Sequence, residues 1–225
     1  MTILYSLLII LGLAYWLEKE SKKFPFKINK QIFQEYQSLT NGNTLFYSFL
    51  KQSQLQYKEI KWIKLLYITF PLITFVLSEQ HFIFTFILAI LIYLSLLDYA
   101  YYLTDIKYII AIFISGLIYI IFYQKYLTEQ SLFSLFFSVV FCLAISKFGL
   151  FFYKKEMLGL GDSLLIIALS PLFTLHQVLQ LLLYASLSGL LFVIGYFVIK
   201  KKIIPRLPFI PFICLSTFIL FIDRI

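Results

Sequence analysis

Eight continuous apolar runs dominate the sequence, and each has about the length of a membrane-spanning helix. They lack the alternation of polar and apolar residues that marks the strands of a membrane barrel, so helices are expected. Only 13% of the residues are charged, whereas about a quarter are charged in a typical soluble chain. The runs cover residues 3–17, 62–78, 82–98, 107–123, 131–151, 163–176, 178–199 and 208–222. The sequence therefore predicts an all-α integral membrane protein of about eight transmembrane helices, with one membrane domain over residues 1–225.

Lysine and arginine are distributed very unevenly among the connections between these runs. If each run crosses the membrane, one set of alternate connections holds 17 of the 19 basic residues, and the other holds Lys125 and Arg224. The rich set comprises residues 18–64, 98–107, 147–155 and 200–206. The positive-inside rule places that set in the cytoplasm and both termini outside. The net charge of +8 is then a topology signal that also attracts anionic lipid, and a nucleic-acid surface is not expected.

The only sizeable polar stretch, residues 18–61, is too short and too rich in lysine for a separate domain. It is expected to form a short cytoplasmic loop within the membrane domain. Residues 28–39 have the amphipathic pattern of a helix that lies on the membrane surface. Cys142 and Cys214 lie far apart inside apolar runs and form no CxxC pair, so they are expected to be small buried hydrophobic residues.

Two aspartates stand at the predicted cytoplasmic edge. Asp98 ends the third apolar run, and Asp162 begins the sixth, just after Gly159 and Gly161. Ionisable groups at membrane depth are functional candidates, and two close carboxyls that share one proton supply an acid and a base for activating water. Structural alternatives stay open, because Asp162 also fits a helix N-cap and Asp98 an interfacial helix end. The glycines fit either a close backbone approach or a turn with positive φ.

The stretch EMLGLGDSLL resembles the GxGD signature of the type IV prepilin peptidases, an aspartyl protease family. Its matching residues are Glu156, Gly159, Gly161 and Asp162. The phrase LSLLDYAYYLTDIKY resembles the part of the family that holds the upstream catalytic aspartate, here Asp98. The resemblance implies that Asp98 and Asp162 are the catalytic pair, and that Gly159, Gly161 and Glu156 shape the loop beside the substrate.

A second motif supports this resemblance near the end of the chain. The phrase IPRLPFIPFI resembles the proline–phenylalanine motif that opens the family's last helix, and the matching residues are Pro208, Phe209, Pro211 and Phe212. Together the likeness covers about residues 85–222. It implies a membrane aspartyl endopeptidase that cleaves the basic leader peptide from type IV prepilins or pseudopilins at the cytoplasmic membrane interface. The implied location is the bacterial cytoplasmic (inner) membrane.

The sequence departs from the family pattern in three places. Thr104 and Asp105 stand where Pro-Asn or Pro-Asp is usual, so Asp105 stays a possible alternative or accessory catalytic residue, although its position also suits a helix cap. Ile210 replaces the usual glycine between the two Pro-Phe pairs. Residues 18–61 lack the cysteine pairs that hold zinc in many members, so neither zinc nor any other metal is expected. S-adenosylmethionine is expected only if the family's N-methyltransferase activity is retained. The reduced loop suggests a competence-type member.

Other motifs suggest other functions. GDSL at residues 161–164 matches a serine esterase motif by its letters, but it opens a membrane helix here rather than a soluble α/β domain. Ser146 and Lys147 suggest a Ser–Lys dyad, although Lys147 is explained by topology. His81 and His176 fall on the opposite side from the aspartates. A non-enzymatic transporter or pilus-assembly subunit is the alternative function, but a transporter places its carboxylates near the bilayer midplane.

Overall fold

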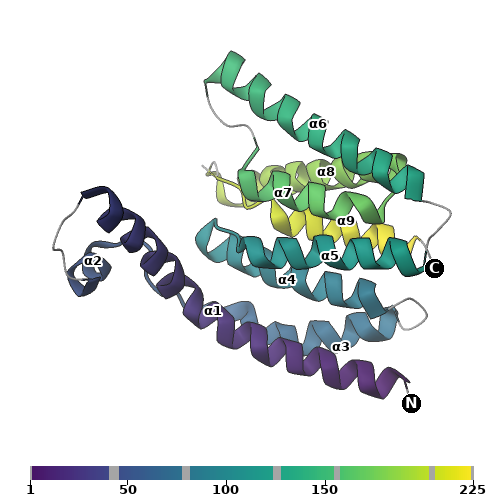
Figure 1. The fold of residues 1–225 in the computed structure, drawn as a ribbon, viewed down its shortest axis with the longest axis horizontal. Coiled ribbons are helices and arrows are strands. Elements are labelled where there is room, and N and C mark those ends of the chain that lie inside the picture. Colours follow the sequence, from purple (N-terminus) through teal and green to yellow (C-terminus); the bar gives the residue numbers. More distant parts are fainter. Residues whose placement is uncertain are drawn as a thin grey trace. The chain divides into compact units, whose positions relative to one another are not determined.

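The computed structural model describes residues 2–40, 46–77, 82–123, 128–154, 158–202 and 206–223. All regular structure in these ranges is helical, which confirms the all-α prediction (Figure 1). The α-helices are α1 (Thr2–Thr40), α2 (Phe46–Gln52), α3 (Leu66–Val76), α4 (Phe82–Tyr101), α5 (Ile106–Tyr123), α6 (Thr128–Tyr153), α7 (Leu160–Leu169), α8 (Leu175–Lys200) and α9 (Ile210–Ile222). Two 3₁₀-helices, η1 (Lys61–Leu65) and η3 (Ser170–Leu172), precede α3 and follow α7.

The chain forms two compact units, residues 1–72 and residues 73–225. The first holds α1, α2, η1 and the start of α3, and the second holds everything from the end of α3 to α9. Both catalytic candidates lie in the second unit. The single membrane domain over residues 1–225 stays a prediction.

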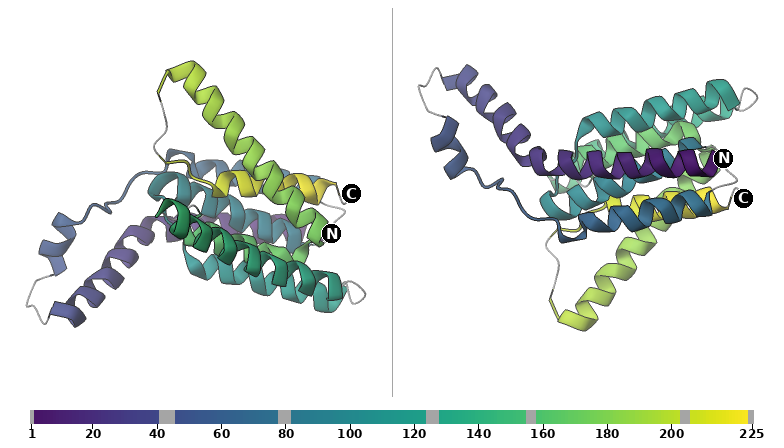
Figure 2. Two further views of the ribbon diagram at one scale, coloured as in Figure 1. Left: turned by 90° about the horizontal axis from the view of Figure 1, so that it is seen from above. Right: turned by 90° about the horizontal axis from the view of Figure 1, so that it is seen from below.

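In the first unit, α1 joins two segments that the sequence suggested were separate. The apolar run 3–17 and the amphipathic stretch 28–39 both lie within this one helix. Pro25 lies inside it, where its ring removes a backbone N–H and crowds the preceding turn. The helix is bent as such a proline requires (Figure 2).

The polar stretch after α1 folds back on it to make a helical hairpin. Phe33 of α1 packs against Phe46 and Phe49 of α2, with ring centroids 5.0 and 5.4 Å apart. The buried Asn29 side chain donates to the Leu55 carbonyl at 2.7 Å and accepts from the Ser53 hydroxyl at 2.6 Å. An aromatic cluster and a satisfied buried amide therefore join residues 18–40 to residues 46–61.

The second unit is built around α4. Helices α5 and α9 pack on α4, α7 packs on α5, α8 packs on α9, and α6 contacts both α7 and α8. Helix α4 is largely buried, whereas α6 and α8 are mostly exposed. At one end of this core, the Phe84 ring lies 4.7 Å from that of Tyr119 and 4.6 Å from that of Phe221. Asp98 is thus carried by the most enclosed helix of the unit.

Successive helices of the second unit run in opposite directions. Helices α4, α6 and α8 end where α5, α7 and α9 begin, all at one end of the unit (Figure 1). Each of the three ending helices is followed by a residue of positive φ, namely Tyr102 (55°), Lys154 (52°) and Lys201 (50°). The left-handed conformation stops a helix abruptly, and glycine usually supplies it. Asp98 and Asp162 both lie at this end of the unit.

Within the described ranges, three helices are long and apolar enough to cross a membrane, namely α4, α6 from Glu129 onward, and α8. The shorter apolar helices cover Trp62–Val76, Ile106–Phe122, Leu160–Leu172 and Ile210–Ile222. Every predicted apolar run is therefore largely helical. The eight crossings and the outside location of both termini stay predictions.

Candidate active site

Asp98 lies in the last turn of α4 with only 7% of its surface exposed. The helix continues to Tyr101, three residues past the predicted end, because the Asp98 carbonyl accepts the Tyr102 N–H at 2.8 Å. The Asp98 carboxyl accepts the Ile210 N–H on Oδ2 at 3.2 Å, and the Phe209 N–H also hydrogen-bonds to it. The N-terminus of α9 is thus directed at the Asp98 side chain.

The proline–phenylalanine motif forms this N-terminus, as the resemblance implied. Phe209 is the N-cap residue, Ile210 is the first helical residue, and Pro211 follows in the first turn. Proline is well tolerated there because the first N–H groups of a helix have no partner within it. Phe212 packs against Phe192 of α8 with ring centroids 5.7 Å apart, and Pro208 lies in the non-helical segment before the helix.

Asp162 is the third residue of α7, and its side chain is half-buried. Gly159 occupies the N-cap position, so the alternative that Asp162 is the N-cap is wrong. The Gly159 N–H hydrogen-bonds to the Asp162 carboxyl from the start of the same helix. A carboxylate in the first turn suits the positive end of the helix dipole.

Close packing explains both glycines of the GxGD motif. A Cβ on Gly159 would lie 3.0 Å from Asp162 Oδ2, and a Cβ on Gly161 would overlap Oγ1 of Thr104. No glycine among the described residues has a positive φ, so the alternative of a left-handed turn is wrong. Gly161 therefore lets the first turn of α7 approach the connection that follows the helix of Asp98.

The two aspartates come together at this end of the second unit. The charge of the Asp98 carboxyl acts on the Asp162 carboxyl, although the two residues come from different helices. Two carboxyls in such proximity cannot both ionise cheaply, so one of them tends to hold a proton. An acid beside a base is the chemistry needed to add water to a peptide carbonyl. Glu156, the other acidic residue of the motif, lies outside the described residues.

Asp105 has a structural role. Its side chain is buried, with 8% exposed, and its Oδ1 accepts the Lys107 N–H at 3.2 Å. Its carbonyl accepts the Tyr108 N–H at 3.1 Å. This is the N-cap geometry for α5, which begins at Ile106, and it agrees with the helix cap suggested by the sequence.

Ser163 and His176, which belong to two of the competing motifs, have ordinary structural positions. The Ser163 hydroxyl is buried and donates to the Gly159 carbonyl of its own helix at 3.1 Å, as a structural serine does. His176 lies in the first turn of α8, at the other end of the second unit from Asp162, and His81 lies outside the described residues (Figure 1). Within the described ranges no three His, Cys, Asp or Glu side chains form a metal-binding group. The expected absence of zinc stays a prediction, as does the need for S-adenosylmethionine if methyltransferase activity is retained.

The first unit contains a second group of charged side chains, beside a cavity of about 390 Å³. Glu18 accepts from the Tyr67 hydroxyl at 2.8 Å and from Lys22 Nζ at 3.0 Å. The Tyr67 hydrogen bond, with a smaller contribution from Lys22, lowers the pKa of Glu18. The cavity lining is Glu18, Ser21, Lys22, Tyr57, Glu59, Ile60, Ile63 and Lys64. Carboxylates and ammonium groups are mixed there, so this cavity does not favour a ligand of one charge.

Sequence reasoning missed two residues at the aspartate site. Thr104 was noted only as a departure from the family pattern, yet it contacts Gly161. Ile210 was noted only as a missing glycine, yet its N–H binds Asp98. The role of Ile210 could have been predicted from the sequence. Its N–H lies between Pro208 and Pro211 at the start of a helix, where backbone N–H groups have no partner in their own helix.

One comparison with known protein families matches the region that holds this site. A family model for the type IV leader peptidase family matches residues 85–194, which confirms the resemblance found in the motifs. The match includes Asp98, Gly159, Gly161 and Asp162, and it ends before α9. No curated protein and no solved structure matches the chain. The match supports a protease, and the long apolar helices support a membrane protein.

Proposed function

We propose that this chain, whose residues 85–194 match the type IV leader peptidase family, is a membrane aspartyl endopeptidase. Its substrates are prepilins or pseudopilins, and it removes their basic leader peptides. The observation that carries the proposal is the meeting of Asp98 and Asp162 at one end of the second unit, where their charges interact. Thr104 and Gly161, which bring the two helix ends into contact, support it further.

In this proposal the chemistry needs only the two carboxyls and one water molecule. One aspartate takes a proton from water, and the water oxygen bonds to the scissile carbonyl carbon. The other aspartate gives its proton to the carbonyl oxygen, and the carbon–nitrogen bond breaks when the leaving amine takes up a proton. No metal or cofactor is proposed for this step.

The proposed topology puts the aspartates at the cytoplasmic interface of a bacterial cytoplasmic membrane. A prepilin has a short basic leader followed by an apolar helix. When that helix lies in the bilayer beside the enzyme, the leader is in the cytoplasm, and the scissile bond is at the depth of the aspartates. The short, cysteine-free segment 18–61 favours a competence-type pseudopilin as substrate.

The test is cleavage of a prepilin co-expressed with the full chain. Leader removal is measured by the change in substrate mass, for the unchanged chain and for Asp98→Asn and Asp162→Asn separately. Each substitution is expected to reduce cleavage at least about a thousandfold, because an amide cannot exchange a proton with water as a carboxyl does. Asp105→Asn is the matched control, since it makes the same change at the same end of the unit.

Membrane insertion of every variant is checked by its extraction with detergent but not with salt. Undiminished cleavage in Asp98→Asn or Asp162→Asn would remove that residue from the catalytic pair. Absence of cleavage by the unchanged chain, with a range of prepilins, would favour a non-enzymatic transporter or assembly subunit. Loss of cleavage in Asp105→Asn alone would move the catalytic role to Asp105.

A further inference from the structure

The Asp98 carboxyl is buried and has lost most of its contact with water. Burying a carboxylate is unfavourable unless donors replace the water it loses. Two backbone N–H groups, those of Phe209 and Ile210, replace that water here. A backbone amide donates and never takes up a proton, so both bonds favour a carboxylate acceptor.

The neighbours of these two residues have no N–H group to offer Asp98. Pro208 and Pro211, which flank them, carry no N–H. The next N–H along the helix, that of Phe212, already donates to the Phe209 carbonyl at 3.0 Å. The remaining donors of the first turn therefore both serve Asp98. They lie at the positive end of the α9 dipole, which also favours a negative charge.

Asp162 is held less firmly as an anion. It receives one backbone N–H, that of Gly159 in its own helix, whereas Asp98 receives two. The repulsion between the two carboxyls acts on both of them, so the number of donors distinguishes them. When two close carboxyls hold one proton, the proton favours the carboxyl with fewer donors.

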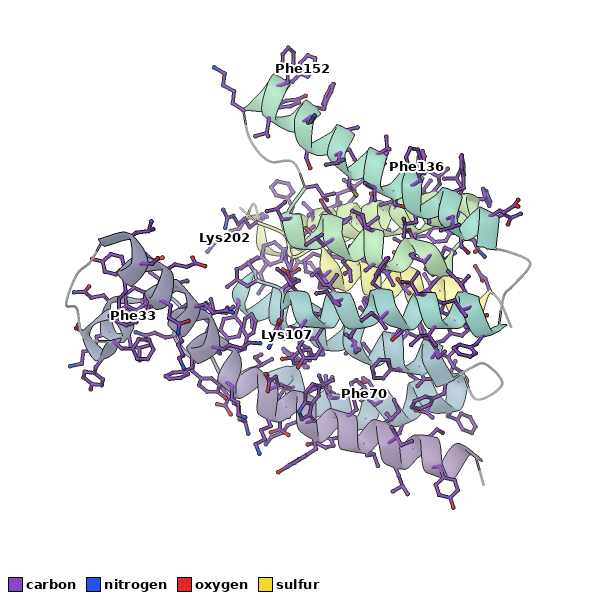
Figure 3. All side chains as sticks on the ribbon, viewed as in Figure 1. Phe33, Phe70, Lys107, Phe136, Phe152 and Lys202 are labelled. Carbon is purple, nitrogen blue, oxygen red and sulfur yellow. The ribbon has the colours of Figure 1, made fainter. Side chains whose placement is uncertain are left out.

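Among the described residues, the other charged groups at this end are a capping aspartate and exposed basic side chains, which include Lys154, Lys200 and Lys201. Asp105 is engaged in capping α5. Lys107, Lys202 and Arg206 are exposed to the surroundings, and Figure 3 labels the first two at this end of the unit. Charges in contact with water are screened far more than a buried pair is.

We propose that the N-terminus of α9 positions Asp98 as the ionised member of the pair, so that Asp98 takes the proton from water and Asp162 carries the proton given to the scissile carbonyl. This assignment rests on the proposed endopeptidase function. Phe209 and Ile210 are positioning residues that act through their backbone. After the water oxygen bonds to the carbonyl carbon, Asp98 passes its proton to the leaving amine. The hydroxyl proton of the tetrahedral intermediate returns to Asp162 as the carbon–nitrogen bond breaks.

The direct test replaces one backbone N–H with oxygen. The full chain is made by cell-free synthesis into nanodiscs with the α-hydroxy analogue of isoleucine at position 210, so that an ester link keeps the side chain and removes the donor to Asp98. Cleavage of a synthetic prepilin is then measured against pH. The ascending limb of the kcat/KM profile is expected to move about one unit to higher pH, because Asp98 loses a donor that stabilises its anion. At pH values below this limb kcat/KM then falls about tenfold. The descending limb is expected to stay unchanged.

The matched control carries the same ester at position 213. The Ile213 N–H donates to the Phe209 carbonyl at 3.3 Å, in the same helical turn but away from Asp98. The ester at position 210 also weakens the Phe209 carbonyl as an acceptor of this bond. The ester at position 213 removes the donor of the same bond, so it reproduces this side effect and is expected to move neither limb. Movement of the descending limb in the 210 ester would reverse the two roles. An unmoved profile would overturn the positioning role altogether.

A second measurement needs no altered backbone. In the unchanged chain labelled with ¹⁵N-isoleucine, the Ile210 amide is identified as the signal missing from Ile210→Val. Its chemical shift is expected to titrate with the ascending limb and to stop titrating in Asp98→Asn, because the amide senses the charge of the carboxyl it binds. Titration with the descending limb, or none, would contradict the proposal. Failure of the proposed function is separate, because it appears as no cleavage by the unchanged chain at any pH.

Discussion

Asp98 stands in the last turn of α4, a helix of 20 residues, whereas Asp162 stands in the first turn of α7, a helix of 10. Asp98 is buried and is bound by backbone donors from a helix 112 residues further along the chain. Asp162 is half-buried and is bound by Gly159, three residues before it. One carboxyl depends on the packing of distant helices, and the other on a local loop motif.

This difference indicates where each half of the pair is vulnerable. The position of Asp162 depends on the space beside Gly159 and Gly161, because a Cβ at either residue would crowd neighbouring atoms. The Asp98 half depends on donors and on the end of its own helix. Substitutions at Gly161, Asp105 and Tyr102, with their control variants, test these two dependences and follow in order of decreasing effect.

Gly161→Ala tests the space beside Asp162. The added Cβ would overlap Thr104 Oγ1 and would lie 3.3 Å from Cβ and Cγ2 of the same residue, so the first turn of α7 must shift. Since a displacement of about 1 Å at a catalytic group lowers the rate about a hundredfold, cleavage is expected to fall by that order. Cleavage assays at saturating substrate measure it.

The double variant Gly161→Ala/Thr104→Ala is the internal control for this prediction. It removes Oγ1 and Cγ2 but leaves Cβ, so it is expected to restore about a tenth or more of the lost activity. Full activity in Gly161→Ala alone would show that this contact does not place Asp162. Absence of any recovery in the double variant would show that Gly161 acts on something other than Thr104.

Asp105 tests the donor side of the comparison, because this buried aspartate also accepts a backbone N–H, in its case as the N-cap of α5. Asp105→Ala is expected to lower the free energy of unfolding by about 0.5–2 kcal/mol, and Asp105→Asn by less, since asparagine is also a good N-cap. Denaturation in mixed micelles measures both. Equal destabilisation by alanine and asparagine would show that the charge of Asp105 matters rather than its cap.

The smallest expected effect is at the end of the Asp98 helix. Tyr102 has φ of 55° and its side chain is half exposed. Tyr102→Gly is expected to raise the free energy of unfolding by roughly 0.5–1 kcal/mol over Tyr102→Ala, because glycine adopts the left-handed conformation without strain. The same denaturation assay compares the two variants, which lose the same aromatic ring. Equal stability would mean that the left-handed residue is relaxed by its surroundings.

Much of the fold could be predicted because lipid-facing helices need continuous apolar runs, and these are visible in the sequence. The break between the sixth and seventh runs exists, but it lies at Phe173 and Thr174 rather than at residue 177, since Thr174 and Gln177 form a capping box that starts α8 at Leu175. The length of α1 could not be predicted, because Pro25 usually ends a helix. Here the helix continues with a bend.

The candidate site was only partly predictable for a similar reason. Gly159, Gly161 and Asp162 form a local motif that can be read in one short phrase. The bond between Ile210 and Asp98 joins residues 112 positions apart, and it uses a backbone N–H that leaves no mark on the side chain. The packing of Gly161 on Thr104 likewise depends on how two connections meet.

The two prolines at the start of α9 have a consequence for the alignment of α9 along α4. If α9 shifted by one residue toward its own C-terminus, Pro208 would occupy the position from which Phe209 now donates to Asp98. If it slid the other way, Pro211 would replace Ile210. In both cases one of the two donors to a buried carboxyl is lost, because proline has no N–H. The phrase Pro-Phe-Ile-Pro therefore specifies a single register between two helices that adjoin in space but not in sequence.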